Sequence, residues 1–384
     1  MAIENGTNSY MPPKTLMLFE NEISPLMAFL GNQDDYVLYN NTTPKYFIDF
    51  WAKLNLKLPK FINNTQLASL NISNIVPWGW SQLIEKQFQS LFNDKSKFAN
   101  LKSHDDHKQF FSRITSVKLI EELSQKTLPD FVSLPTLPKI ADNTKVILEH
   151  LRANNDGIVI KNLWSSSGRG ITFIKDEKGY NQKLNWIRSQ LKKHKSLIIE
   201  SIYNKVQDAS LQFIIDNDRN YTFLGINYFD SDEEGHFEKE YFHTPTKLQN
   251  ALPDNKQWIQ QLAAQLIRAM QTQNIHNQYN GPIGIDVMFI ADENEQVKLY
   301  PLIEANLRCN MGLINLHIKK LLANNVKGHW CISTFKPGEA LTFYVQQIQK
   351  HPIQVQDNKI SEGFFPLTPF TNNTRFAAWG LIEK

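Results

Sequence analysis

The sequence feature that most constrains this chain is a pair of apolar segments, residues 284–290 and 298–308, separated by the polar stretch 292–296. The polar stretch has the composition of a turn, and the flanking segments have the apolar content of strands. Side chains alternate between the two faces of a strand. Because the polar positions of both segments fall in phase, the pattern predicts a hairpin that collects polar groups on one face.

The polar face of this hairpin carries the first candidate site. Glu304, Asn306 and Arg308 alternate along the second strand, and a turn near residue 295 places Asp286 beside Glu304. Two carboxylates and an amide oxygen then converge, a set that suits Mg²⁺ or Mn²⁺ held together with substrate phosphates. Without a cation the carboxylates repel each other or share a proton. Arg308 is placed to contact an anion. The alternative is a solvated surface hairpin, which explains each residue alone but not their common phase.

A second candidate element is an apolar strand that ends in Lys161 and leads into a loop rich in serine and glycine. A lysine at this position can reach a phosphate as a compact point charge. Glycine lets backbone N–H groups approach phosphate oxygens, and serine adds hydroxyl donors. No Gly-Lys-Ser/Thr follows, so the loop is not a P-loop. Taken alone, it is better explained as an ordinary hairpin turn.

A third candidate element is the apolar strand 197–200, which ends in Glu200 and could form the edge of an adenine pocket. On the next strand Asp208 alternates with Ser210 and Gln212. Core strands with one solvated face explain these residues better when they are considered by themselves.

The order of these elements resembles the ATP-grasp superfamily, which includes biotin carboxylase and the D-alanine–D-alanine ligases. Residues 160–171 (IKNLWSSSGRGI) are similar to its lysine strand and phosphate-covering loop, and residues 303–308 (IEANLR) to its carboxylate–asparagine–arginine strand. The resemblance covers about residues 108–316. It implies an α/β architecture in which an ATP-grasp fold of two α+β subdomains follows a pre-ATP-grasp domain. The expected divisions are residues 1–107, 108–196 and 197–384, the last with a C-terminal extension.

The resemblance also implies a role for each candidate residue. Lys161 would bind the α- and β-phosphates, and Arg308 would stabilise the transferred phosphoryl group or an acyl-phosphate, so these two are the expected catalytic residues. Mg²⁺ or Mn²⁺ would be bound by Asp286, Glu304 and Asn306. The other positions expected to bind ATP are Ser165, Ser167, Gly168, Arg169, Gly170, Glu200, Ser201, Ile202, Tyr203 and Asp208.

One position departs from the family pattern. Many ATP-grasp enzymes have a lysine at the start of the first helix of the first subdomain, whereas this chain has Arg113 there. An arginine can still bind phosphate, and does so bidentately. Lys118, one turn further along the same helix, is the alternative phosphate contact.

The resemblance implies an ATP- and Mg²⁺-dependent ligase that joins a small-molecule carboxylate to an amine (or thiol) through an acyl-phosphate. A small-molecule kinase on the same fold is one alternative, and a nucleotide-binding module without turnover is another. The identities of the acid and the amine are left open, as is the oligomeric state.

Composition narrows the partners. The chain has 41 Lys and Arg residues against 38 Asp and Glu, a net charge of +3, so it lacks the basic excess of a nucleic-acid-binding protein. No apolar run approaches the ~18 residues that span a bilayer. The two cysteines exclude a disulfide framework. A cytoplasmic protein without nucleic-acid or membrane partners is predicted.

Three further segments carry weaker predictions. Residues 15–19 (TLMLF) are typical of a short buried strand, and the acidic and aromatic stretch 229–247 is typical of a long mobile loop. The aromatic segment 77–80 (PWGW) either lines a substrate mouth or packs as buried aromatic residues at a turn, the second being favoured. The region 328–384 has no motif that predicts chemistry.

Overall fold

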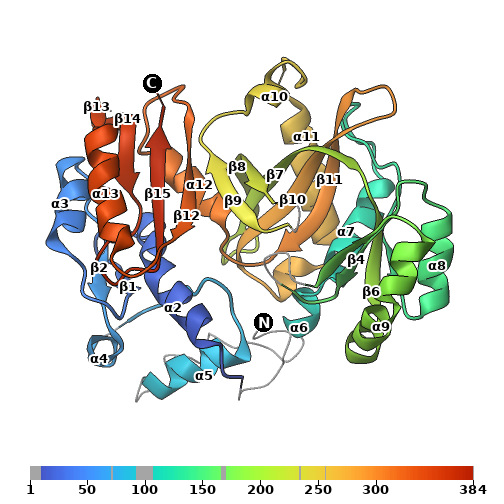
Figure 1. Ribbon diagram of the computed structural model, residues 1–384, viewed down its shortest axis with the longest axis horizontal. Helices are drawn as coiled ribbons and strands as arrows, with labels where there is room; N and C mark the ends of the chain where they lie inside the picture. Colours follow the sequence, from blue (N-terminus) through green and yellow to red (C-terminus); the bar gives the residue numbers. More distant parts are fainter. Residues whose placement is uncertain are drawn as a thin grey trace.

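The computed structural model describes residues 10–70, 72–91, 107–165, 170–232, 235–255 and 257–383. Its strands form three sheets within these residues (Figure 1). One sheet has nine strands in the order β11-β10-β7-β8-β9-β12-β15-β14-β13, one has four in the order β3-β6-β4-β5, and one is the parallel pair β1-β2. The strands are β1 (Tyr36–Leu38), β2 (Lys60–Ile62), β3 (Lys139–Ala141), β4 (Ile158–Asn162), β5 (Ile171–Ile174), β6 (Leu197–Ser201), β7 (Asn204–Ile215), β8 (Tyr221–Ser231), β9 (Phe237–Tyr241), β10 (Gly281–Ala291), β11 (Val297–Asn306), β12 (Gly328–Thr334), β13 (Gln354–Gln356), β14 (Lys359–Pro366) and β15 (Phe376–Ile382).

Helices cover these sheets and connect their strands. They are α2 (Lys14–Ile23), η1 (Ser24–Phe29), α3 (Lys45–Lys53), α4 (Asn64–Leu67), α5 (Gln82–Leu91), α6 (His107–Phe110), α7 (Arg113–Ser124), α8 (Thr144–Arg152), α9 (Glu177–His194), α10 (Thr246–Gln249), α11 (Gln257–Thr272), η3 (Ile275–Asn277), α12 (Met311–Lys319) and α13 (Glu339–Lys350). None of them is both long and apolar enough to cross a membrane, as far as the described residues extend.

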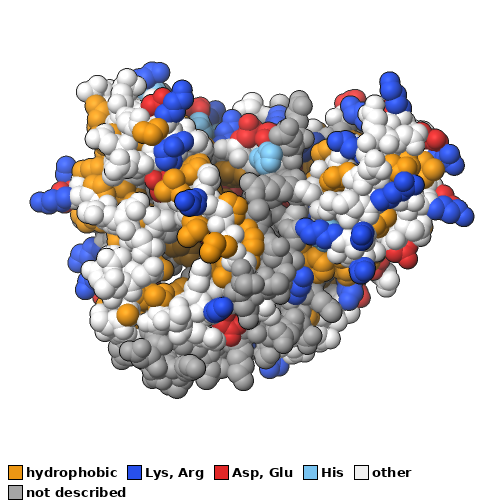
Figure 2. Space-filling model, turned by 60° about the horizontal axis from the view of Figure 1, so that its bottom comes forward, with side chains coloured by type: hydrophobic (Ala, Val, Ile, Leu, Met, Phe, Trp, Pro, Cys, Tyr) orange, Lys and Arg blue, Asp and Glu red, His pale blue; other side chains and the backbone are white. Residues whose placement is uncertain are grey.

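The four-stranded sheet packs against α8 and α9. Asn143 and Asp176 begin these helices, because their side-chain oxygens accept hydrogen bonds from the free N–H groups of the first turns. Ile147 and Ile187 then face the buried strands. Figure 2 shows Lys and Arg side chains over the part of the molecule where these helices lie. Strand β6 pairs with β3 and β4, so this sheet continues to residue 201, beyond the expected division at 196.

The larger sheet is continuous, but its two halves are covered differently. On β7 and β10, Leu211, Phe213, Ile285 and Phe289 face a core that includes apolar residues of α7 and α11. The residues between them, such as Ser210 and Asp286, alternate onto the opposite face. Helix α12 contacts β7, β8 and β9. The strand alternation thus separates an apolar face from a polar one, and the candidate site lies on the polar one.

The N-terminal elements pack against the C-terminal strands, as the blue and red segments of Figure 1 show. Phe47 and Trp51 of α3 share a core with Trp330 and Phe365. The buried carboxylate of Glu22 accepts hydrogen bonds from the backbone N–H groups of residues 375 and 376, at 2.8–3.2 Å. Residues 328–383, which belong to the region without a motif, therefore extend the large sheet and support the N-terminal elements.

Two predicted segments have different structures. Residues 15–19 lie in the helix α2 and not in a strand; a five-residue apolar run does not distinguish the two periods. The prediction of a long loop over 229–247 is wrong, because the stretch contains the end of β8, all of β9 and the beginning of α10. Its charges pair across the strands: Lys239 lies 3.5 Å from Asp230, whose carboxylate also accepts from Tyr241. Cross-strand pairing thus organises a segment whose composition looked like a loop.

Candidate nucleotide and metal site

The predicted hairpin of residues 284–308 is formed by β10 and β11. Asp292 shapes the turn because its Oδ1 accepts hydrogen bonds from the backbone N–H groups of residues 294 and 296. Glu295 adopts a φ of 58°, which the turn requires. In the resulting register Asp286 pairs with Glu304 and Gly284 with Asn306. The predicted juxtaposition of the two carboxylates is confirmed.

Hydrogen bonds continue from this carboxylate pair to Arg308. Asn306 Nδ2 donates to Asp286 Oδ2 at 2.9 Å, and Arg308 Nη2 donates to Asn306 Oδ1 at 2.9 Å. Burial and, after it, the negative charge of Glu304 raise the pKa of Asp286 to about 7. Asp286, Glu304 and Asn306 therefore lie together as the hairpin predicted.

These residues fit a hard divalent cation. Asp286 and Glu304 are directly opposed in the strand register, and a cation between them would offset both the burial and the repulsion that raise the pKa of Asp286. Magnesium is commonly bound through one or two carboxylates and completed by phosphate oxygens and water. Within the described ranges, no group of three or more His, Cys, Asp and Glu side chains is arranged to bind a metal.

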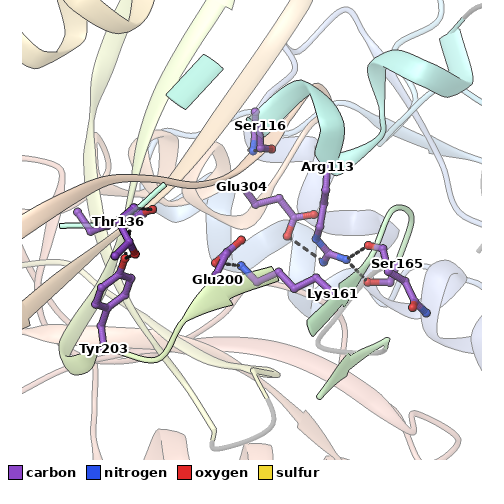
Figure 3. A network of polar contacts seen from close by, with 11 residues as sticks. Arg113, Ser116, Thr136, Lys161, Ser165, Glu200, Tyr203 and Glu304 are labelled. Carbon is purple, nitrogen blue, oxygen red and sulfur yellow. Dashed lines mark hydrogen bonds and ion pairs between the residues drawn. The ribbon is translucent and has the colours of Figure 1, made fainter. Parts of the chain in front are cut away.

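Arg113 approaches the same carboxylates from α7. Ser112 begins this helix, with its Oγ accepting from the N–H of residue 114. Arg113 Nη1 donates to the carbonyl oxygen of Asn162 and to Ser165 Oγ, both at 2.7 Å, and Nη2 donates to Glu304 Oε2 at 3.1 Å (Figure 3). Lys118, the alternative phosphate contact, is exposed on the same helix. The structure thus brings Arg113, and not Lys118, to the candidate site.

Lys161 reaches the region from the four-stranded sheet. It lies on β4, and its Nζ is 2.6 Å from Oε2 of Glu200 on the neighbouring strand β6. Both side chains are almost completely buried. Figure 3 shows Lys161 and Arg113 extending toward the same region from β4 and α7. Arg113 and Lys161 thus lie near each other, each with its carboxylate partner, Glu304 and Glu200 respectively (Figure 3).

The residues expected to surround adenine bond to several different segments of the chain. Ser201 Oγ hydrogen-bonds to Asn154 Oδ1 at 2.7 Å and to Thr136 Oγ1 at 2.9 Å. The Tyr203 hydroxyl also binds Thr136 Oγ1, at 2.5 Å. The N–H of Ile202 donates to the carbonyl oxygen of Gly157 at 3.2 Å. These groups join the end of β6 to the segment around Thr136 and to residues 154–157, and no motif pointed to Thr136.

The remaining predicted positions lie around this centre. Asp208 accepts hydrogen bonds from Lys205 Nζ, at 2.8 Å, and from the Ser231 hydroxyl. Gly170 has a φ of +74°, and a Cβ added there would lie 2.6 Å from Asn162 Nδ2, so the position requires glycine. Ser167, Gly168 and Arg169 lie outside the described residues.

Two contacts near the site were not predicted from the sequence. Ser116 Oγ accepts a hydrogen bond from the N–H of Ala305 at 2.9 Å, so α7 is fastened to β11, the strand that carries Glu304. A Cβ added to Gly79 would lie 3.3 Å from the Cβ of Arg308, so the segment 77–80 lies directly against that arginine. The aromatic composition of the segment was the available signal, and it did not indicate which residue it contacts.

Comparisons with known proteins find likeness in structure only. No protein-family model and no curated protein matches the sequence. The ADP complex of N5-carboxyaminoimidazole synthetase from Staphylococcus aureus is similar at 11% identity, over 95% of this chain and 91% of that one, with a TM-score of 0.50.

Two biotin carboxylases have a similar likeness. The biotin carboxylase domain of Hydrogenobacter thermophilus 2-oxoglutarate carboxylase, crystallised with MgADP, ADP and bicarbonate, is 12% identical over 95% of this chain and 84% of that one, with a TM-score of 0.52. The Campylobacter jejuni biotin carboxylase complex with β-γ-ATP is 13% identical over 94% and 84%, also with a TM-score of 0.52. At these identities the likeness shows a shared fold.

Proposed function

We propose that this chain, which has the ATP-grasp fold, is an ATP- and Mg²⁺-dependent ligase that joins a small-molecule carboxylate to an amine or thiol through an acyl-phosphate. One observation carries the proposal. Asp286 and Glu304 are opposed in register, and Glu304 forms an ion pair with Arg113, which approaches from α7 while Lys161 extends from β4 (Figure 3). The similar structures are named as complexes with ADP, MgADP or β-γ-ATP, which supports ATP as the nucleotide in this proposal.

The proposed reaction has two displacements. An oxygen of the substrate carboxylate attacks the γ-phosphorus, and the bond to the β–γ bridging oxygen breaks to release ADP. The amine nitrogen then attacks the acyl carbon, the carbon–oxygen bond to phosphate breaks, and the amine loses a proton to solvent. The protein's contribution is to position the reactants and to stabilise negative charge.

The chain's own residues divide this task. Lys161 provides a buried positive charge for the α- and β-phosphates, exchanging its present partner Glu200 for them. Asp286, Glu304 and Asn306 would bind Mg²⁺, which when bound neutralises phosphate charge. Arg308 lies beyond the carboxylates and would stabilise the transferred phosphoryl group. Because Gly79 touches its stem, the N-terminal elements would contribute to the acceptor side.

The division of the chain is part of the same proposal. Residues 1–107 would form the pre-ATP-grasp domain, and the two ATP-grasp subdomains would follow it. Since β6 belongs to the four-stranded sheet, we place the division between them after residue 201.

Thermal unfolding with a non-hydrolysable ATP analogue tests the nucleotide, with and without Mg²⁺. We expect stabilisation that requires Mg²⁺ and that persists in Lys118→Ala, because Lys118 is exposed away from the site. ADP release is then measured over a panel of carboxylates with and without amines and thiols.

The outcomes separate the alternatives. ADP release that needs both an acid and an acceptor supports the ligase. Release without an amine or thiol, with a stable phosphorylated product, would identify a kinase. Stabilisation without ADP release would identify a binding module, and no stabilisation at all would remove the nucleotide from the proposal.

A further inference from the structure

Arg113 is the residue on which the two sides of the candidate site converge. Its guanidinium donates three hydrogen bonds, to the carbonyl oxygen of Asn162, to Ser165 Oγ and to Glu304 Oε2. Its Nε–H is buried and has no partner among the described residues. One arginine thus connects the end of strand β4 to the carboxylate that is expected to bind a metal.

The ion pair between Arg113 and Glu304 opposes the binding of a metal to Glu304. The side chain of Arg113 is 5% exposed and that of Glu304 is 27% exposed, so solvent screens their charges only in part. A guanidinium 3.1 Å from a carboxylate already neutralises it, whichever oxygen a cation would use. A divalent cation that approaches Glu304 must therefore overcome the repulsion of Arg113.

A nucleotide phosphate changes this balance. It offers oxygens to the unpartnered Nε–H and to the Nη2 of Arg113 together, which is the bidentate geometry that guanidinium groups prefer. It also neutralises the positive charge. Glu304 is then free of its counter-ion at the moment when phosphate oxygens become available to complete a metal site.

We propose that Arg113 is a positioning residue that holds Glu304 in the absence of nucleotide and releases it when a phosphate takes the guanidinium. Metal and nucleotide then load together, because each removes an obstacle to the other. The inference rests on the proposed function and adds to it a reason for arginine at this position: the guanidinium reaches three acceptors at once, whereas a lysine ammonium acts as a point charge.

Mn²⁺ binding, followed by electron paramagnetic resonance, measures this coupling without turnover. The proteins compared are the wild type, Arg113→Gln and Arg152→Gln. Arg152 is the matched control because it also pairs with a carboxylate, Glu177, at 2.7 Å, but on the surface of the four-stranded sheet's helices. Each protein is titrated with Mn²⁺ alone and again in saturating non-hydrolysable ATP analogue.

Removing a charged hydrogen bond to Glu304 should strengthen nucleotide-free Mn²⁺ binding by Arg113→Gln about tenfold. Arg152→Gln should bind Mn²⁺ as the wild type does. The factor by which the analogue strengthens Mn²⁺ binding should be about tenfold smaller in Arg113→Gln than in the wild type, because the obstacle is already gone.

Unchanged nucleotide-free Mn²⁺ affinity in a folded Arg113→Gln protein would overturn the inference while leaving the proposed function intact. A wild type that binds Mn²⁺ neither alone nor with the analogue would instead remove the proposed function. If Arg113→Gln does not fold, Arg113→Lys takes its place. The lysine should hold Glu304 less strongly, so nucleotide-free Mn²⁺ binding should again become stronger. An Arg113→Lys protein with the Mn²⁺ affinity of the wild type would overturn the inference.

Discussion

Two polar clusters lie on the nine-stranded sheet, and they differ in what covers them. The first is the candidate site, with Arg113 and Glu304 at its centre. The second, which we call the α12 network, consists of Asn227, Glu240, Asn315 and Lys319. A row of paired residues joins the two clusters across β11, β10, β7 and β8, and its members are Glu304, Asp286, Ser210 and Asn227.

Hydrogen bonds among its own side chains hold the α12 network together. Asn315 Nδ2 lies 3.0 Å from Asn227 Oδ1 and 3.1 Å from Glu240 Oε2, and Lys319 Nζ donates to Asn227 Oδ1 at 3.3 Å. Burial between α12 and the sheet raises the pKa of Glu240 to about 8 and lowers that of Lys319 to about 8. Its donors and acceptors come from one helix and the strands directly beneath it.

The candidate site, in contrast, joins elements of different sheets. Arg113 of α7 hydrogen-bonds both to Asn162 at the end of β4 and to Glu304 on β11, and the ion pair of Lys161 and Glu200 lies beside it in the four-stranded sheet (Figure 3). A ligand that enters between the sheets can exchange these pairs for its own charges, whereas a ligand would have to lift α12 to reach the network. A polar strand face alone therefore does not identify a ligand-binding site. Whether a ligand can reach that face depends on the element that covers it.

The largest effect is expected from Glu304, the residue at which the two sheets meet. Glu304→Ala removes one of the two opposed carboxylates and should reduce Mg²⁺-dependent turnover on the order of 10³-fold, because phosphate charge would lack its neutralising cation. Steady-state ADP release measures the loss. Glu362→Ala, a carboxylate change on β14 far along the sheet from β11, serves as the control. Retained activity in Glu304→Ala would refute the metal assignment.

The second prediction concerns the buried pair of Lys161 and Glu200. Lys161→Met leaves Glu200 buried and without its partner, which should cost about 3–5 kcal/mol of unfolding free energy. Urea unfolding measures the change. The double variant with Glu200→Gln should recover part of the loss, since no uncompensated charge remains. Arg152→Met breaks an exposed pair and should change stability little. Equal effects in Lys161→Met and Arg152→Met would contradict the comparison.

The sequence could predict the first cluster better than the second. Strand alternation and a turn near residue 295 were enough to place Asp286 beside Glu304, because both are local properties of one hairpin. The position of Arg113 followed from a family resemblance. Nothing local showed that α12 would cover Ser210 and Gln212, which lie a hundred residues earlier in the chain. Coverage depends on tertiary packing, and periodicity carries no information about it.

Gly312 provides the third prediction, because it allows α12 to approach the sheet. A Cβ added there would lie 2.7 Å from Ser210 Oγ and closer still to Gln212 Nε2. Gly312→Ala should therefore destabilise the protein by about 1–3 kcal/mol, although alanine favours helices. Gly179→Ala in α9 is the control: its nearest neighbour is the side chain of Asp176, at 3.3 Å, so the substitution should be neutral or stabilising. Thermal unfolding of both variants measures the difference. Equal shifts in their unfolding temperatures would show that α12 is not closely packed on the network.

The smallest effect, when it is taken over a single pH unit, is a pH dependence that belongs to the α12 network. Because the pKa of Glu240 is about 8 in the folded protein and near 4.5 in the unfolded chain, the folded state holds an extra proton between those values. Stability should then fall as pH rises from 5 to 8, at up to about 1.4 kcal/mol per pH unit for that group. Glu240→Gln cannot titrate and should lose this part of the slope in urea unfolding at pH 5, 6, 7 and 8.

The sign of this effect distinguishes Glu240 from its neighbour. A lowered pKa of Lys319 removes stability as pH falls from about 10.5 to 8 and adds no slope below 8, so a decline between pH 5 and 8 is not due to the lysine. A Glu240→Gln protein whose stability falls as steeply as that of the wild type would mean that Glu240 is charged beneath α12. The network would then be an ion pair that a ligand could exchange, and the contrast with the candidate site would be lost.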